Sequence, residues 1–377
     1  MINTFSFPTK IIFGAGALAH LPAALGEIGG HRPLLVADKG LVAAGLLAPV
    51  RNLLKRSDCE PHVFDEVLSN PVEDNVIAGV RHYLAKGCDC VIALGGGSPL
   101  DMGKAIALMS THAWPMEQYD DKCEGYKNIR PSLPPIIAIP TTAGTGSEIG
   151  RSTVITLKSS GRKTVIFSPH LMPKIALVDP ELTLALPPHL TAATGMDALT
   201  HCIEAYVARG YHPLCDAVAL HGIKLVGRSL EKAFTRGRDL SARSDMMMAA
   251  LMGAVAFQKG LGVCHSLAHP LSTIAGLHHG LANAVMLPYV LEFNRAAAGD
   301  SLSEIAEALA GKPQQDIVDL IVALNGRLGI PGKLSEIGVC HEHIPAMIEQ
   351  AWEDACHELN PRPVAREDLM NLYEVAM

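Results

Sequence analysis

The first half of the chain alternates short, continuously apolar runs with longer amphipathic segments. Four apolar runs that end in turn residues are predicted to be strands: 33–38 (PLLVAD), 90–97 (CVIALGGG), 135–142 (PIIAIPTT) and 175–180 (IALVDP). Strands that are apolar on both faces are typical of a parallel sheet covered by helices on each side. The intervening segments, such as 40–56 and 75–87, have helical spacing, so the pattern predicts a doubly wound α/β domain.

The pattern changes after residue 182. Strand-like runs nearly vanish, and long helical segments rich in Ala, Leu and Met follow, including 190–208 and 243–260. A chain of 377 residues is also too long for one ordinary core. We therefore predict two domains, an α/β dinucleotide-binding domain at 1–182 and an all-helical domain at 183–377.

Composition narrows the class of protein. Apolar residues make up 49% of the chain and the net charge is -7, which gives no electrostatic reason to expect nucleic acid or an anionic membrane as a partner. The N-terminus lacks the features of a signal peptide, and no apolar run is long enough to span a membrane without interruption. Nine scattered cysteines without an export signal favour reduced thiols. We expect a cytoplasmic protein that binds neither nucleic acid nor a membrane.

Two glycine-rich loops follow predicted strands of the first domain. In VIALGGGSPLDMGKAIAL (91–108) a strand runs into three glycines, after which Ser98 is expected to cap a helix and Asp101 to complete a capping box. Such a loop lets the backbone close on a phosphate, and the start of the helix supplies free N–H groups. The loop IPTTAGTGSE (139–148) is rich in Thr and Ser and suits hydrogen bonds to a nucleotide. Two such loops favour a bound dinucleotide over ordinary turns.

An acidic residue, Asp38, ends the predicted strand 33–38. A carboxylate at this place can accept from ribose hydroxyls and repels a 2′-phosphate, which predicts NAD rather than NADP. A solvated loop aspartate is the alternative. A second glycine match, FGAGALAHL (13–21), has the spacing of a dinucleotide fingerprint, but a lone match of this kind is a weak signal.

The segment GVCHSLAHPLSTIAGLHHG (262–280) holds four histidines among apolar residues. A buried imidazole needs a partner for each ring nitrogen, so a metal ion or a substrate is expected nearby. His265 and His269 are four residues apart and share a helical face, as do Asp197 and His201 in GMDALTHCIEAY. Taken alone, Asp197 and His201 fit a hydrogen-bonded pair as well as two ligands of one ion.

Several long segments resemble the signature segments of the iron-containing (group III) alcohol dehydrogenase family. They are GGGSPLDMGKAI, IPTTAGTGSE, ATGMDALTHCIEAY, GLGVCHSLAHPL and HHGLANAVMLP, and they occur in order over nearly the whole chain. The resemblance implies the dehydroquinate synthase-like fold of these enzymes, with a nucleotide-binding α/β domain followed by a helical metal-binding domain. It also implies one Fe(II), with zinc or manganese as alternatives, and the ligands Asp197, His201, His265 and His279. His269 then faces the nicotinamide and the substrate.

The same resemblance implies an NAD site and a substrate pocket. The cofactor positions fall on Asp38, Asn70, Gly97, Ser98, Thr141, Thr142 and Lys163, with Thr145 and Ser147 as further neighbours of the phosphates or nicotinamide. Cys356, in DACHELNPR, matches a cysteine near the substrate pocket of the family, although a packed thiol is an equal alternative. The family also implies a homodimer or an assembly of dimers.

The implied reaction is the NAD-linked interconversion of a short primary alcohol and its aldehyde. The ion would lower the pKa of the alcohol, hydride would pass to the nicotinamide, and His269 would relay the proton. Arg151 comes just after the second glycine-rich loop and Lys259 lies six residues before His265, so both are candidates for binding a substrate carboxylate. LTAATGMDALTHCIE and AFQKGLG resemble the 4-hydroxybutyrate dehydrogenase branch, which implies an ω-hydroxy acid such as 4-hydroxybutyrate. Both cations fit surface positions equally well.

Other functions remain open from the sequence. Within the same fold they are a short-chain alcohol or diol dehydrogenase without an anion pocket, a zinc-dependent glycerol dehydrogenase, and a dehydroquinate synthase-like lyase. From other classes they are a metal-dependent hydrolase and a non-catalytic metal-binding protein. The glycine-rich nucleotide loops argue against a hydrolase.

Overall fold

The computed structural model describes residues 7, 9–313 and 315–377. The described chain forms two compact units. The first comprises Phe7–Thr142 and Gly146–Ala185, and the second comprises Ala143–Thr145 and Leu186–Met377. The sequence pattern places the boundary at residue 182, whereas the chain enters the second unit after Ala185. The short excursion of 143–145 into the helical unit has no counterpart in the pattern.

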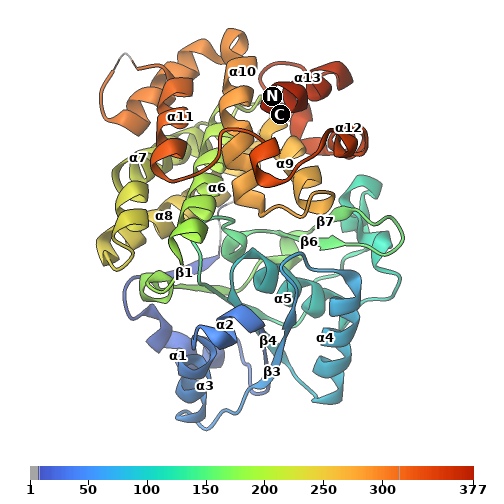
Figure 1. Ribbon diagram of the computed structural model, residues 1–377. Helices are drawn as coiled ribbons and strands as arrows, with labels where there is room; N and C mark the ends of the chain where they lie inside the picture. Colours follow the sequence, from blue (N-terminus) through green and yellow to red (C-terminus); the bar gives the residue numbers. More distant parts are fainter. Residues whose placement is uncertain (1–6, 8, 314) are drawn as a thin grey trace. The chain divides into compact units, whose positions relative to one another are not determined.

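The first unit is built on a six-stranded parallel sheet (Figure 1). Its strand order is β1-β8-β5-β4-β2-β3. The strands are β1 (Lys10–Phe13), β2 (Pro33–Asp38), β3 (His62–Val67), β4 (Cys90–Gly95), β5 (Ile136–Pro140) and β8 (Ile175–Val178). The four predicted strands are therefore confirmed as β2, β4, β5 and β8, and β1 and β3 are additional.

Helices cover both faces of this sheet. Leu34 and Val36 of β2 pack in one apolar cluster with residues of α4 and α5, whereas Leu35 and Ala37 pack in a second cluster with residues of α1 and α3. The covering helices are α1 (Leu21–Glu27), α2 (Lys39–Ala43), α3 (Leu47–Lys55), α4 (Glu73–Ala85) and α5 (Gly97–Met109). Successive side chains of a strand point to opposite faces, so a run that is apolar throughout serves both clusters. The predicted doubly wound α/β fold is confirmed.

An antiparallel ribbon adds to this unit. It consists of β6 (Ser152–Thr156) and β7 (Lys163–Phe167), paired from Ser152 with Phe167 to Thr156 with Lys163. Only alternate residues of β6 are buried, so it lacks the continuous apolar run that marks the central strands. Continuous apolar runs in the sequence therefore do not predict this ribbon.

The second unit is helical, and no strand occurs in its described residues. Its helices are α6 (Pro188–Val207), α7 (Pro213–Thr235), α8 (Leu240–Ala256), α9 (Val263–Thr273), α10 (His279–Ala310), α11 (Ile317–Arg327), α12 (Ile344–Trp352) and α13 (Arg366–Ala376). The predicted all-helical second domain is thus confirmed.

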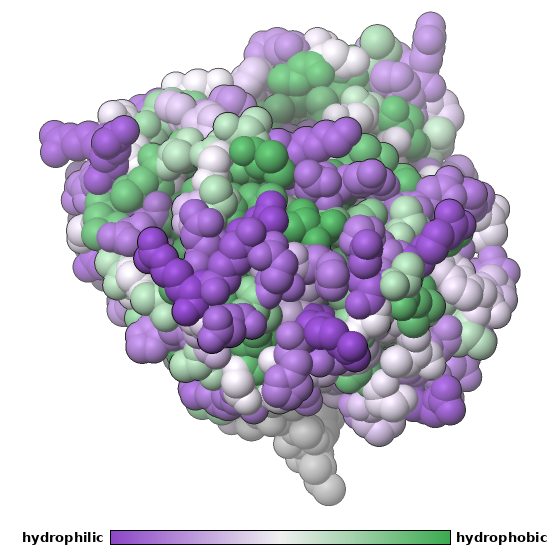
Figure 2. Space-filling model, turned by 90° about the horizontal axis from the view of Figure 1, so that it is seen from below, coloured by the Kyte–Doolittle hydropathy of each residue, from purple (hydrophilic) through white to green (hydrophobic). Residues whose placement is uncertain are grey.

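On the face of the molecule in Figure 2, hydrophilic residues are interspersed with small hydrophobic areas.

Among the described helices, none is by itself both long and apolar enough to cross a membrane. One bent pair of segments, Leu240–Lys259 with Val263–Thr273, meets the length and composition test jointly.

Candidate metal centre and nucleotide site

One face of helix α6 carries three polar side chains into the helical unit. Asp197, His201 and Glu204 are spaced by four and three residues, so they lie one above the other on the same face. All three are at least 95% buried. Buried polar groups of this kind require partners, and two other helices supply them.

Helices α9 and α10 bring histidines to this face. His265 lies in the first turn of α9, and His279 is the first residue of α10. The next residue, Gly280, lies so close to α6 that a Cβ there would come within 2.2 Å of the carbonyl oxygen of Ala193. Glycine at this position therefore lets the start of α10 reach Asp197.

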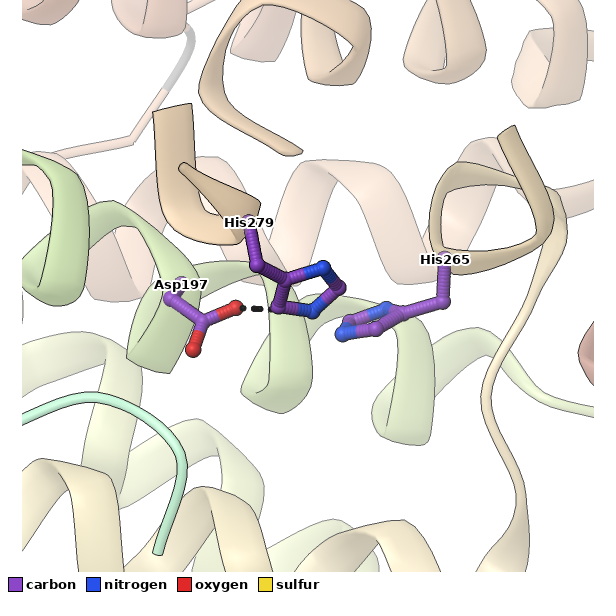
Figure 3. A group of neighbouring side chains, drawn as sticks. All are labelled: Asp197, His265 and His279. Carbon is purple, nitrogen blue, oxygen red and sulfur yellow. Dashed lines mark ion pairs between the residues drawn. The ribbon is translucent and has the colours of Figure 1, made fainter. Parts of the chain in front are cut away.

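Asp197, His265 and His279 form a compact set of potential metal ligands (Figure 3). Each offers one ligand atom, and the three atoms lie within 4.8 Å of one another. The Oδ1 atom of Asp197 is 3.5 Å from Nε2 of His279. Two imidazoles and one carboxylate are the donor set of many non-haem Fe(II) sites, in which other coordination positions stay open.

His201, the fourth predicted ligand, lies directly beside this set. Its ring stacks on that of His265 with 4.6 Å between the centroids, although it is outside the compact group of three. Burial lowers the pKa of His201 to about 4, so the ring is neutral at physiological pH. Its buried Nδ1 has no hydrogen-bond partner in the described part of the chain. A neutral imidazole with an unsatisfied buried nitrogen fits a bound cation, and the residues present therefore suit the metal of the predicted site.

Two residues that the sequence analysis did not identify support the ligands. Glu204 Oε2 lies 2.5 Å from His265 Nδ1, and its Oε1 accepts from the backbone N–H of Cys264 at 2.7 Å. Although burial opposes the charged form of the ring, the Glu204 carboxylate raises the pKa of His265. A carboxylate behind a ligating imidazole fixes the tautomer and leaves Nε2 for the ion. The spacing from Asp197 to Glu204 on one helix is the signal that could have revealed it.

The second supporting residue is Asn283, one turn after His279 on α10. Its side-chain amide nitrogen donates to Asp197 Oδ1 at 2.9 Å and lies 3.3 Å from His265 Nε2 and 3.2 Å from His279 Nε2. Asn283 is fully buried. The amide therefore points at the same three atoms that would face a cation.

His269 has a carboxylate partner of its own. Its Nδ1 lies 2.7 Å from Asp354 Oδ2, and the other oxygen of Asp354 accepts from Ser266 Oγ at 2.8 Å and from the backbone N–H of Cys356 at 2.9 Å. Burial alone would raise the pKa of Asp354, but His269 holds it well below the usual range. The ring of His269 stacks on that of His279 with centroids 5.2 Å apart. This places the predicted proton-relay residue next to the ligand set, with its ring orientation fixed by Asp354.

The predicted nucleotide residues of the α/β unit gather at one edge of the sheet. Asp38, Gly97 and Thr141 follow or end the adjacent strands β2, β4 and β5, and Asn70 follows the neighbouring β3. The carboxyl ends of parallel strands, where the strand order reverses, are the usual place for a dinucleotide. Thr142 lies against the same loop, since a Cβ on Gly96 would be 3.3 Å from its side chain.

Helix α5 begins differently from the prediction. It starts at Gly97, so the predicted cap at Ser98 and the capping box with Asp101 are wrong. Ser98 Oγ instead donates to the carbonyl oxygen of Ser69 at 2.6 Å, which joins the first turn of α5 to the loop after β3. A glycine at the N-cap leaves the N–H groups of the first turn available for an anion.

Ser147 takes part in a buried polar network. Its hydroxyl donates to Asp101 Oδ1 at 2.6 Å and lies 2.8 Å from Lys104 Nζ. Burial lowers the pKa of Lys104 to about 8. Burial also raises the pKa of Asp101, while Lys104 and Lys163 act in the opposite direction. Ser147 and Lys163 therefore lie in one charged cluster of the α/β unit, whereas Thr145 belongs to the helical unit.

The two cations predicted to bind a substrate carboxylate have different surroundings. Lys259 is largely buried, and its Nζ lies 2.6 Å from Asp216 Oδ1 and 2.9 Å from the carbonyl oxygen of Tyr206. Its charge is therefore already compensated within the protein. The guanidinium of Arg151 lies over the ring of Phe167 at 5.3 Å, and no ion pair of Arg151 occurs among the described residues. The third predicted substrate residue, Cys356, lies beside His269 and Asp354.

Comparison with known proteins gives a consistent result. Residues 8–180 match the family profile "iron-containing alcohol dehydrogenase", and residues 191–377 match the C-terminal profile of the Fe-containing alcohol dehydrogenase family. The chain is 41% identical to 4-hydroxybutyrate dehydrogenase of Cupriavidus necator, with 98% of each chain covered. The crystal structure of a 1,3-propanediol oxidoreductase superposes with a TM-score of 0.95 at 35% identity and covers both chains fully. Sulfoacetaldehyde reductase from Bifidobacterium kashiwanohense, solved with NAD+, has a TM-score of 0.90 at 31% identity and covers 100% of this chain and 99% of its own.

The chain therefore belongs to the iron-containing alcohol dehydrogenase family. The predicted family, fold and class of enzyme are confirmed, including the likeness to 4-hydroxybutyrate dehydrogenase. A hydrolase and a non-catalytic metal-binding protein are excluded by this membership. The roles of individual residues stay predictions.

Proposed function

We propose that the protein is an Fe(II)-dependent, NAD-linked dehydrogenase that interconverts short ω-hydroxy acids of the 4-hydroxybutyrate type and their semialdehydes. The observation that carries the metal-dependent part is the convergence of Asp197, His265 and His279, with Glu204 behind His265. His201, stacked on His265, is proposed as the fourth ligand. When bound, a divalent ion supplies Lewis acidity that lowers the pKa of a substrate hydroxyl and polarises a carbonyl.

The side chains around this centre have distinct tasks in the proposed reaction. Glu204 holds His265 in one tautomer, and Asn283 orients the carboxylate of Asp197. Asp354 keeps the proton on Nδ1 of His269, which leaves Nε2 to accept the substrate hydroxyl proton as hydride leaves the carbinol carbon. The α/β unit binds NAD at the carboxyl ends of β2, β4 and β5, where Asp38 disfavours a 2′-phosphate.

A substrate with an anionic end is supported by two relatives. One is a 4-hydroxybutyrate dehydrogenase and the other a sulfoacetaldehyde reductase, and both names describe a short chain with an acidic group. We propose Arg151 as the cation that binds this group, because its guanidinium has no carboxylate partner among the described residues. The ion pair of Lys259 with Asp216 argues against Lys259 in this role.

The proposal is tested with a panel of short alcohols, diols and ω-hydroxy acids, assayed with NAD and added Fe(II). We expect 4-hydroxybutyrate to exceed 1-butanol and 1,3-propanediol in kcat/KM. An ionic contact is worth about 1.5–3 kcal/mol, which corresponds to roughly one to two decades in kcat/KM. Arg151→Met should remove most of that preference, while Arg56→Met, at an exposed arginine of the same unit, should retain it. If 1-propanol or 1,2-propanediol has the highest kcat/KM, the proposal of an anionic substrate is rejected. The assignment of the protein as a dehydrogenase would still hold.

Adding glycerol as a substrate and zinc as an alternative metal to this assay distinguishes the other members of this fold. A zinc-dependent glycerol dehydrogenase would prefer glycerol and be active with zinc alone. We also propose a dimer, or an assembly of dimers, since family membership makes this the default expectation. The nine scattered cysteines favour a reducing compartment, so we propose that the protein is cytoplasmic.

A further inference from the structure

Beside the predicted iron ligands lies a second group of potential ligands that includes sulfur. His269, Asp354 and Cys356 each offer one ligand atom, and these atoms lie within 4.8 Å of one another. The Asp197, His265 and His279 group offers only nitrogen and oxygen, so the two groups differ in chemistry. We propose that His269, Asp354 and Cys356 form a second, inhibitory site for a borderline-soft divalent cation such as Zn²⁺.

The chemical types of the three ligands indicate which ion this group would bind. Imidazole, carboxylate and thiolate are the three ligand types of zinc, and an open zinc site has three protein ligands with water in the fourth position. Hard cations such as Mg²⁺ and Ca²⁺ select oxygen ligands and would not use a thiolate. A mixed nitrogen, oxygen and sulfur group therefore selects zinc and its chemical relatives.

The group is held in place by hydrogen bonds before any ion arrives. Asp354 lies just before the short turn that carries Cys356, and it accepts both from the backbone N–H of Cys356 and from Ser266 Oγ on α9. His269 lies in the second turn of α9, and its Nδ1 faces Asp354 Oδ2. Two short segments that are distant in sequence are thereby fixed against each other, which lowers the cost of assembling a metal site.

The ligands are also accessible to an ion. The side chains of His269 and Asp354 are 22% and 18% exposed, and Cys356 is partly exposed. In the first group, the side chains of Asp197 and His265 are only about 2% exposed, whereas that of His279 is 24% exposed. Each group therefore has at least one ligand that a dissolved cation can reach.

The hydrogen bonds around Asp354 suit a carboxylate that can bind a cation. Its Oδ1 accepts from Ser266 Oγ and from the backbone N–H of Cys356, and its Oδ2 faces His269 Nδ1. On binding, the thiol of Cys356 would release its proton to water and the thiolate would bond to the ion. His269 would bind through the ring nitrogen that carries no proton, and the ring proton would stay on the other nitrogen.

The consequence for catalysis rests on the proposed function. A zinc ion in this group would bind the imidazole of His269, to which we assign proton relay and whose ring centroid is 5.2 Å from that of His279. Zinc would then inhibit the iron-loaded enzyme without displacing its iron. Binding at the second group does not depend on this role, so the two parts can be tested separately.

Cobalt(II) titration of the metal-free protein tests the binding part, because thiolate–cobalt bonds give an intense near-ultraviolet charge-transfer band. We expect two equivalents of Co(II) to bind per chain, and binding of one of them should produce this band. Cys356→Ser should bind one equivalent without the band, whereas Cys123→Ser, at an exposed cysteine of the α/β unit, should behave like the wild type. His279→Ala should lose the sulfur-free equivalent and keep the band. A wild-type protein without the band, or a band that survives Cys356→Ser, would overturn the proposal.

Inhibition of the iron-loaded enzyme by Zn²⁺ tests the second part. The zinc concentration for half-inhibition should rise about tenfold or more in Cys356→Ser, since one ligand of three is lost. His269→Gln provides a second variant for the cobalt titration if Cys356→Ser does not fold. Inhibition that parallels the release of iron into solution would show displacement instead and would reject the inhibitory role.

Discussion

The carboxylate of Glu204 lies 2.5 Å from Nδ1 of His265, and both side chains are almost fully buried. We expect Glu204→Gln to weaken Fe(II) binding about tenfold to a hundredfold, because an amide no longer stabilises the tautomer that presents Nε2 to the ion. Competition with a chelator of known affinity measures this effect independently of turnover. Glu307→Gln, at an exposed position of α10, is the matched control and should bind iron normally. An unchanged iron affinity in Glu204→Gln would exclude the supporting role.

A second prediction concerns Asp354 and His269, whose side chains are 2.7 Å apart. If Asp354 acts by orienting His269, Asp354→Asn should lower kcat by at least about tenfold, with a smaller change in KM. The double variant with His269→Gln should then be no slower than His269→Gln alone, since the carboxylate has nothing left to orient. Rate losses that simply multiply in the double variant would mean that the two residues act independently.

The third prediction concerns Lys259 and its ion pair with Asp216. Lys259→Met leaves a carboxylate without its partner and should lower the free energy of unfolding by about 1–3 kcal/mol. Asp216→Asn should cause a comparable loss. The ratio of kcat/KM values for 4-hydroxybutyrate and 1-butanol should stay the same in both variants. A selective loss with 4-hydroxybutyrate in Lys259→Met would instead place Lys259 at the substrate, as the sequence alone suggested.

The fourth prediction concerns the choice between NAD and NADP. Asp38 ends β2 and also caps α2 by accepting from the backbone N–H of Leu41 at 2.9 Å. Asp38→Ser removes the charge and keeps a capping oxygen, so it separates the electrostatic effect from loss of the helix cap. We expect the preference for NADH over NADPH to narrow in this variant, as judged from the two kcat/KM values. A wild-type enzyme that already prefers NADPH would contradict the role of Asp38.

The sequence was sufficient for the features that depend on regular patterns. Continuous apolar runs predicted β2, β4, β5 and β8, because residues on both faces of a covered parallel sheet must be apolar. The ribbon of β6 and β7 was missed because it buries only alternate residues. Helical spacing also placed Asp197 with His201 and His265 with His269 on common faces.

Other features depend on contacts between distant segments, and local patterns do not contain them. Glu204 meets His265 61 residues later, and Asp354 meets His269 85 residues earlier. The predicted capping box failed because Asp101 instead accepts from Ser147 and from the backbone of Val154, on a later segment. Lys259 likewise looked available for a substrate until Asp216, 43 residues away, proved to be its partner.

The central claim is that Asp197, His201, His265 and His279 hold the one iron on which dehydrogenase activity depends. The most direct measurement compares the iron content, activity and NAD affinity of wild-type protein and His265→Ala, both purified without air. The wild type should contain about one Fe(II) per chain, because these four ligands form a single site. His265→Ala should lose iron and activity together and retain NAD binding on the separate α/β unit. Full dehydrogenase activity in a metal-free preparation, or normal iron content in His265→Ala, would contradict the account.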